Sequence, residues 1–187
     1  MSRHMSRSLL IFIVFTVLLT TGCGCSSNGG HPFPGSAEKI YVDALAAAKK
    51  SNKAVQLVFS NSEVTWCQRL DEYHADAQVA KILDKHLISI RFDLIETPGG
   101  FNMFLERGSG ERGQPAFTFV DYKGMLLADS GDVGENVGFP NNDDEVNRYL
   151  AALKTACPEI TADELALLRA KLEALRVEIT PEPDPID

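Results

Sequence analysis

Cys67 is the residue whose type and position in this 187-residue chain could do chemistry. It follows residues 54–59, Ala-Val-Gln-Leu-Val-Phe, an apolar run that predicts a buried strand. The polar residues 60–63 separate this run from apolar residues at roughly helical spacing over 66–83. We therefore expect strand, tight loop and one helix, with Cys67 in the first turn of that helix. Unpaired backbone N–H groups and the positive end of the helix dipole would favour a thiolate there.

The residues around Cys67 resemble the thioredoxin-like family, in particular its exported and lipoprotein branch, whose motif is roughly F-x-x-x-x-C-x-W-C-K-x-L-D/E. Phe59 lies five residues before Val64, which is the family's usual spacing between the strand phenylalanine and the first motif cysteine. In this register Trp66 directly precedes the second cysteine position, which Cys67 occupies. The resemblance thus implies that residues 64–67 are a CxxC motif that has lost its first cysteine.

This loss limits the redox chemistry open to the motif. The first cysteine of such a pair is the exposed, low-pKa nucleophile, and the second is the more buried resolving thiol. Valine at position 64 can neither attack a disulfide nor form one, so two-cysteine cycling within the motif is excluded. The resemblance to thiol–disulfide oxidoreductases therefore leaves the activity open.

Three interpretations of Cys67 remain. It is a buried relic in a redox-inactive binding or scaffold module, or it is a working single thiol that forms mixed disulfides on envelope proteins or small thiols. A single thiol could receive a weak hydrogen bond from Thr65 and support from Arg69, the basic residue of the motif. In the third interpretation Cys67 and His74 bind a metal, but a third ligand is missing. We predict no metal and no cofactor.

Residues 113–124, Gly-Gln-Pro-Ala-Phe-Thr-Phe-Val-Asp-Tyr-Lys-Gly, carry the second informative pattern. Pro115 before an apolar strand resembles the cis-proline that faces the CxxC site in the thioredoxin fold, and a cis X–Pro bond costs only about 0.5–1 kcal/mol. A trans-proline at a strand start is the alternative. The resemblance implies a groove near Trp66, Gln114 and Pro115 that would hold an extended segment of a protein partner by strand addition. Trp66 could equally be a core anchor.

The remaining segments complete a thioredoxin-like order. We expect an α/β fold with a central mixed β-sheet flanked by helices, an N-terminal helix and an extra C-terminal helix. The extra helix follows a capping box formed by Thr161 and Glu164, and its leucines are expected to pack against the domain. His74 and His86 are expected on helix surfaces. The other expected elements are a helix over 37–51, a strand over 87–93, a short helix over 101–107, a final strand over 125–128 and a helix that starts at Asp143.

The N-terminal residues predict export. Residues 1–22 hold two arginines ahead of an apolar core over 9–19, which is short of the roughly 20 residues that span a bilayer. Residues 20–23, Thr-Thr-Gly-Cys, resemble a lipoprotein signal box in which Cys23 becomes lipidated, although Leu19 lies one place further upstream than the box prefers. Cleavage without lipidation and an uncleaved anchor are the alternatives. We expect a cell-envelope protein that faces the periplasm or the extracellular space.

The predicted organisation has four parts. These are a signal peptide over 1–22, a flexible tether over 23–36, a domain over 37–176 and a disordered tail over 177–187. The net charge of −8, without a basic patch, argues against a nucleic-acid partner. The expected partners are a peptide segment in the groove and a membrane reached through Cys23. A structural envelope-assembly protein, whose anchor and acidic surface matter more than its groove, is the alternative class.

Overall fold

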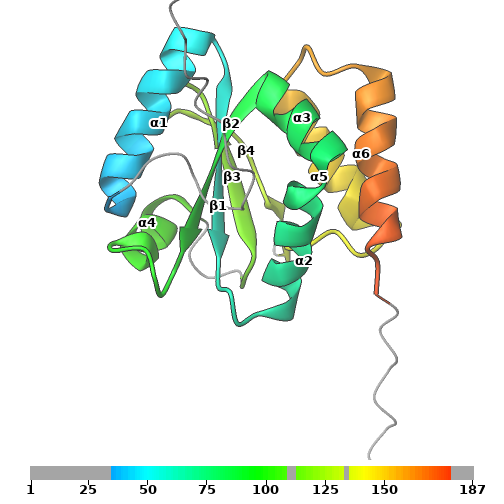
Figure 1. The fold of residues 1–187 in the computed structure, drawn as a ribbon, viewed down its shortest axis with the longest axis horizontal. Coiled ribbons are helices and arrows are strands. Elements are labelled where there is room, and N and C mark those ends of the chain that lie inside the picture. Colours follow the sequence, from blue (N-terminus) through cyan, green and yellow to red (C-terminus); the bar gives the residue numbers. More distant parts are fainter. Residues whose placement is uncertain (1–34, 109–112, 133–134, 178–187) are drawn as a thin grey trace, which may run out of the picture.

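The computed structural model describes residues 35–108, 113–132 and 135–177, and a four-stranded sheet lies at its centre (Figure 1). The strand order is β2-β1-β3-β4, in which β1 pairs in parallel with β2 and antiparallel with β3, and β4 pairs antiparallel with β3. This confirms the expected central mixed sheet. The strands are β1 (Ala54–Ser60), β2 (Leu87–Asp93), β3 (Ala116–Val120) and β4 (Leu126–Asp129).

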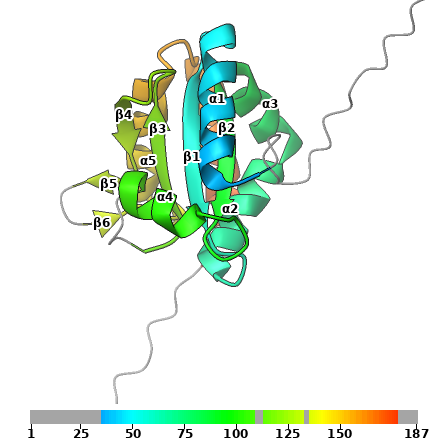
Figure 2. The same ribbon diagram turned by 90° about the vertical axis from the view of Figure 1, so that its left-hand side faces the viewer.

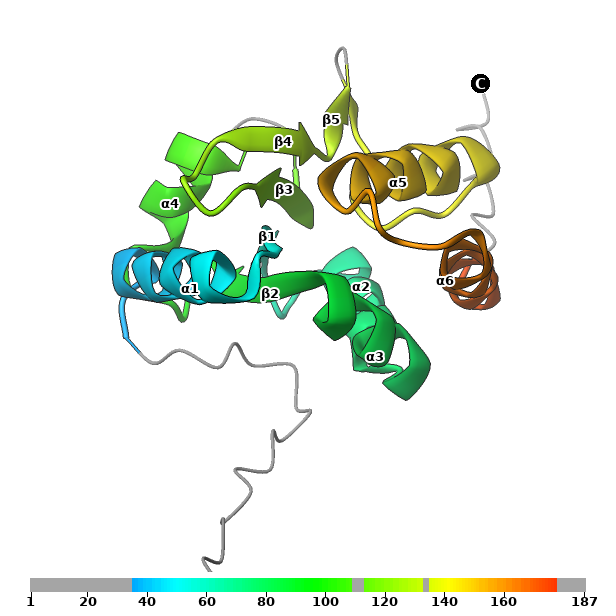
Figure 3. The ribbon, with the colours of Figure 1, turned by 90° about the horizontal axis from the view of Figure 1, so that it is seen from above.

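Helices cover both faces of the sheet, as Figures 2 and 3 show. Helices α1 (Ala37–Ser51) and α4 (Gly100–Arg107) lie on one face. The opposite face carries α2 (Thr65–Ala75), α3 (Ala77–His86) and α5 (Asp143–Ala156), and α6 (Ala162–Ala174) packs outside them against α3 and α5. The expected N-terminal helix and extra C-terminal helix are therefore both present.

Strand β1 divides the hydrophobic core into two parts. All seven of its residues are buried, because successive side chains point to opposite faces and helices cover both. Val55, Leu57 and Phe59 pack in the cluster under α1 and α4, whereas Ala54 and Val58 pack in the cluster under the other four helices. Because β1 is anchored on both faces, it fixes the position of the loop that follows Ser60 and of Cys67 at the start of α2.

The single helix predicted over 66–83 is two helices. Asp76 has an extended backbone conformation, with φ −61° and ψ 126°, and it ends α2 and caps α3. Its carboxylate accepts hydrogen bonds from the backbone N–H groups of Gln78 and Val79, over 2.9 and 3.2 Å. Side chains of this type compete with a continuing helix because they satisfy the first N–H groups of a new one.

Two further differences follow β4. The predicted final strand is not the last one, since a short antiparallel hairpin of β5 (Gly131–Asp132) and β6 (Glu135–Asn136) comes after it. The hairpin leads directly into the loop before α5, so it brings Asn136 near the start of β3. The short helix expected from Phe101 begins one residue earlier, at Gly100.

Helix α6 bears out its predicted start and packing. Thr161 and Glu164 form the capping box, and Leu168 and Leu172 are fully buried against the domain. The predicted signal peptide, Cys23, residues 23–34 of the tether and residues 178–187 of the tail lie outside the described residues. In the ranges that the structure does describe, no helix combines the length and apolar character needed to cross a membrane.

Candidate functional site

Cys67 is the third residue of α2, and its side chain has 0% exposure to solvent. The backbone N–H of Asn61 donates a hydrogen bond to its sulfur over 3.3 Å. Burial raises the pKa of the Cys67 thiol above its ordinary value, and this outweighs the opposite effects of Asn61 and Ser60. The expectation that a thiolate is favoured at this position is therefore wrong, because burial raises the thiol pKa more than its hydrogen bonds and the Arg91 charge lower it.

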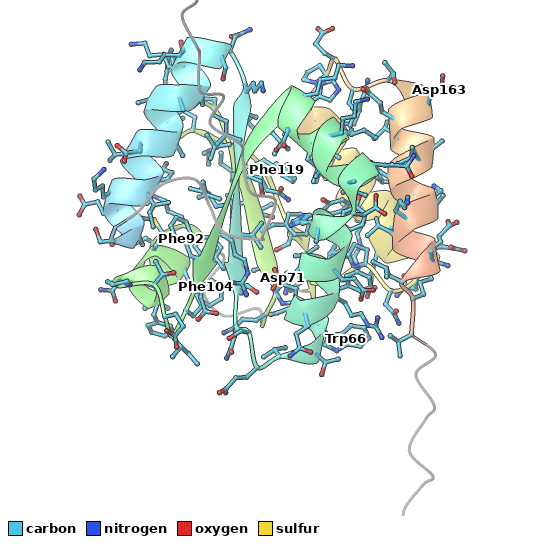
Figure 4. The ribbon with its side chains drawn as sticks, in the orientation of Figure 1. Trp66, Asp71, Phe92, Phe104, Phe119 and Asp163 are labelled. Atoms are coloured by element: carbon cyan, nitrogen blue, oxygen red, sulfur yellow. The ribbon has the colours of Figure 1, made fainter. Side chains whose placement is uncertain are left out.

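The charged groups near Cys67, Arg91 and Asp71, form an ion pair with each other. The Arg91 guanidinium lies 2.9 Å from the Asp71 carboxylate and 3.7 Å from that of Asp93, and it donates to the Ser60 hydroxyl over 3.0 Å. Figure 4 shows Asp71 between α2 and the sheet. Two carboxylates share one cation, so little positive charge remains to stabilise a thiolate. The nearby cation is thus Arg91 and not the expected Arg69.

The other residues of the motif do not assist the thiol. Arg69 forms an exposed ion pair with Glu72 over 2.9 Å and is not the cation that acts on Cys67. The side chain of Thr65 is exposed, and no hydrogen bond joins it to Cys67 among the described contacts. Val64 is the N-cap residue of α2, half-buried, and provides no side-chain cap. The position that would hold a nucleophilic cysteine therefore carries the half-buried, unreactive side chain of Val64.

A groove of about 300 Å³ lies beside the motif. The Gln114–Pro115 peptide bond is cis, as expected, and Gln114, Pro115 and Trp66 all line the groove. The Trp66 ring, at the end of the molecule where α2 begins (Figure 4), stacks on Phe139 with ring centroids 6.2 Å apart and planes 16° apart. Trp66 is thus both anchored to the domain and half-exposed in the groove. Val64, Thr65 and Cys67 do not line it.

The groove is also lined by residues that were not predicted from the sequence, among them Asn136, Phe139, Asn141 and Glu145. Asn136 holds the proline loop, because its Nδ2 donates to the carbonyl oxygens of Pro115 over 2.8 Å and Gly113 over 3.3 Å. Its position depends on the β5–β6 hairpin, which has no clear sequence pattern. Phe139 could have been found, since the Gly-Phe-Pro segment over 138–140 resembles the Gly-Tyr-Pro before the last helix in the family.

The two histidines of α2 and α3 do not project from the surface as expected. Burial lowers the pKa of His74 to about 4, with a further contribution from the Arg91 charge, and its Nε2 is enclosed without a hydrogen-bond partner among the described residues. The Nε2 of His86 lies 2.9 Å from the Glu164 carboxylate, which joins α3 to α6. No group of three or more His, Cys, Asp or Glu side chains is placed for a metal in the described ranges.

Cys157 lies at the opposite end of the sheet from Cys67. It caps the C-terminus of α5 and lines a hollow with Ala54, the first residue of β1, whereas Cys67 follows the last. Both thiols are free and buried, and burial raises the pKa of Cys157 to about 11. Cys157 is therefore a free thiol at a helix end, remote from Cys67.

Comparisons with known proteins show similarity over part of the chain. Residues 38–120 match the family model Thioredox_DsbH, whose description is "Protein of unknown function, DUF255". The chain is similar to the structure of a disulphide isomerase from Xylella fastidiosa Temecula1, with 18% identity over 76% of this chain and 97% of that one and a TM-score of 0.49.

Two further solved structures are similar to the chain. For one described as "DsbH Oxidoreductase", the identity is 18% over 70% of this chain and 87% of that one, with a TM-score of 0.47. For a thioredoxin from Thermus thermophilus, the identity is 24% over 42% and 59%, with a TM-score of 0.36. No curated protein sequence matches the chain.

Proposed function

We propose that this chain is a redox-inactive protein of the thioredoxin-like family that binds an extended segment of a partner protein beside Pro115. The burial of Cys67, together with valine at the first motif position, carries this proposal. A nucleophilic thiol must be reachable and largely ionised, and Cys67 has 0% exposure and a raised pKa. Position 64, where a reactive thiol would be half-exposed, holds Val64.

The groove supports a binding role independently of the thiol. Ala116 is the first residue of β3 that pairs with β1, opposite Phe59, so the backbone of Gln114 lies beyond the hydrogen-bonded part of the sheet. An extended peptide that lies beside Gln114 could use these backbone groups and add a short strand. Trp66 supplies a half-exposed aromatic surface of the kind that dominates interface energetics.

The location of the protein belongs to the same proposal. We propose that residues 1–22 direct export, and that Cys23 carries a lipid which holds the domain in the cell envelope. The sequence pattern over 1–23 and the match to the Thioredox_DsbH model support this placement. A tether that ends at residue 36 would leave the groove free to meet partners.

A peptide-selection experiment tests the binding role. Immobilised protein is challenged with a random dodecapeptide phage library, and enriched peptides are then measured against Trp66→Ala. We expect the substitution to weaken binding at least about tenfold, as truncation of an aromatic hot spot does. Phe101→Ala is the matched control, since Phe101 is an exposed aromatic on α4 outside the groove.

Equal loss of binding in both variants, or no loss in either, would contradict the groove as the binding site. A structural envelope-assembly protein that uses its outer surface would show the latter result. A single-thiol enzyme would instead enrich peptides through disulfides that reducing agents release.

A further inference from the structure

Two side-chain oxygens of the residues that line the groove have no hydrogen-bond partner among the described residues. The Oε1 of Gln114 and the Oδ1 of Asn136 are both buried, and neither accepts a hydrogen bond from a described residue. The orientation of the Asn136 amide is fixed, because its Nδ2 donates to two backbone carbonyls. Both oxygens are enclosed, so a ligand in the groove does not contact them directly, and they mark a polar edge of the groove whose buried acceptors cost free energy.

The groove also carries a negative charge. Glu145 is the ionisable side chain among the described residues that line it. One of its oxygens accepts the backbone N–H of Asn141 over 2.7 Å. The neighbouring Asp143 and Asp144 pair with arginines, whereas no ion pair within the described ranges includes Glu145. The charge of Glu145 is thus available to a ligand.

An aromatic wall completes the groove. Trp66 stacks on the buried Phe139 with their planes 16° apart, and the half-exposed Trp66 ring faces the groove beside Glu145. Cations are attracted to such rings, and the planar guanidinium of arginine stacks on them while its five N–H groups remain free to donate. The Glu145 carboxylate and the half-exposed Trp66 ring beside a groove of about 300 Å³ match this group better than a neutral or acidic one.

We propose that the groove takes an arginine side chain of the bound peptide segment. The guanidinium lies against the Trp66 ring and pairs with Glu145. This specificity rests on the proposed binding function, and it narrows the partners to proteins with an arginine in an accessible extended segment. The net charge of −8 favours the encounter with such basic segments.

Capped pentapeptides test the specificity. The probe is acetyl-Ala-Ala-Arg-Ala-Ala-amide, and the matched ligands replace arginine by citrulline, which keeps the shape and loses the charge, or by lysine. Affinities are measured by titration calorimetry on the full chain in a mild detergent. We expect the arginine peptide to bind about tenfold more tightly than the citrulline peptide, and more tightly than the lysine peptide.

Substitutions in the protein test whether Glu145 causes the preference for arginine over citrulline. Glu145→Gln keeps an acceptor for Asn141 and removes the charge, so it is expected to abolish the arginine-over-citrulline preference. Asp144→Asn removes the same charge one residue away, outside the groove, and is expected to keep it. Gln114→Glu adds a second carboxylate to the groove and is expected to increase the preference for arginine over citrulline.

The outcomes separate this inference from the proposed function. Equal binding of the arginine and citrulline peptides, weakened alike by Trp66→Ala, would overturn the arginine specificity and leave the groove as a binding site. Loss of the preference in Asp144→Asn as well as in Glu145→Gln would also overturn it, since the effect would then be one of overall charge. Failure of all peptides to bind would overturn both proposals together.

Discussion

The backbone N–H of Asn61 donates to the Cys67 sulfur over 3.3 Å, and this contact holds the thiol beneath the loop that joins β1 to α2. The loop covers the sulfur completely, so the thiol is part of the core and is not offered to a substrate. In this protein the groove beside Pro115 and the residual motif cysteine are therefore separate features.

Val64→Cys is expected to create disulfide chemistry that the native chain lacks. The new thiol would stand at the N-cap of α2, half-exposed beside unpaired backbone N–H groups, three residues before Cys67. Turbidimetric reduction of insulin by the variant should proceed measurably, with the native chain at the background rate. Val64→Ala, which adds no thiol, and Val64→Cys combined with Cys67→Ser should both stay at background. A variant that forms no disulfide would show that Val64 is not the only feature that keeps this motif from disulfide chemistry.

His74 is expected to make the folded chain sensitive to mild acid. Its pKa falls from 6.5 to about 4 on folding, because burial and the Arg91 charge disfavour the imidazolium. Between these pH values the unfolded chain binds a proton that the folded chain does not, so the unfolding free energy falls as the pH falls. The slope attributable to His74 approaches about 1.4 kcal/mol per pH unit.

Urea titrations between pH 7 and 5 measure this slope. Most carboxylates titrate below this pH range and therefore contribute little to it. His74→Phe keeps a ring in contact with Tyr73 and should flatten the curve there. An unchanged slope in that variant would mean that His74 is solvated enough to protonate in the folded state.

Asp76→Ala is expected to destabilise the chain by about 1–2 kcal/mol, the usual cost of losing an N-cap. Asp76 caps α3 through two backbone N–H groups and forms an ion pair with Lys171 of α6 over 2.7 Å. Asp84→Ala is the control, because Asp84 is an exposed acid of the same helix, and its effect should stay within about 0.5 kcal/mol. Chemical denaturation measures both. Similar effects for the two variants would contradict the role of Asp76 as the junction of α2 and α3.

Much of this fold could be predicted from the sequence, and the misses have physical causes. The strand over 54–59 was evident because a β-branched apolar run allows few other structures, and Pro115 was evident from its place before a second such run. The break at Asp76 was missed because the apolar residues keep nearly helical spacing across it. Only the cap hydrogen bonds of Asp76 show that one helix has become two.

The candidate site was predicted in part. The motif register placed Trp66, Gln114 and Pro115 together, and the structure lines one groove with all three. The state of Cys67 could not be predicted, because the burial that raises its pKa is a property of the tertiary structure and not of the local sequence. Asn136 and Glu145 come from segments whose tertiary positions no local pattern reveals.

The alkylation rate of Cys67 tests the central claim most directly. Cys23, Cys25 and Cys157 are replaced by serine, so that Cys67 is the one remaining thiol of the four, and iodoacetamide is added across a range of pH. The account predicts no measurable reaction in the folded protein and complete reaction in concentrated urea, because the sulfur has 0% exposure. Fast alkylation of the folded protein, with a pKa well below the unperturbed value of about 8.5, would contradict it and establish Cys67 as a working thiol.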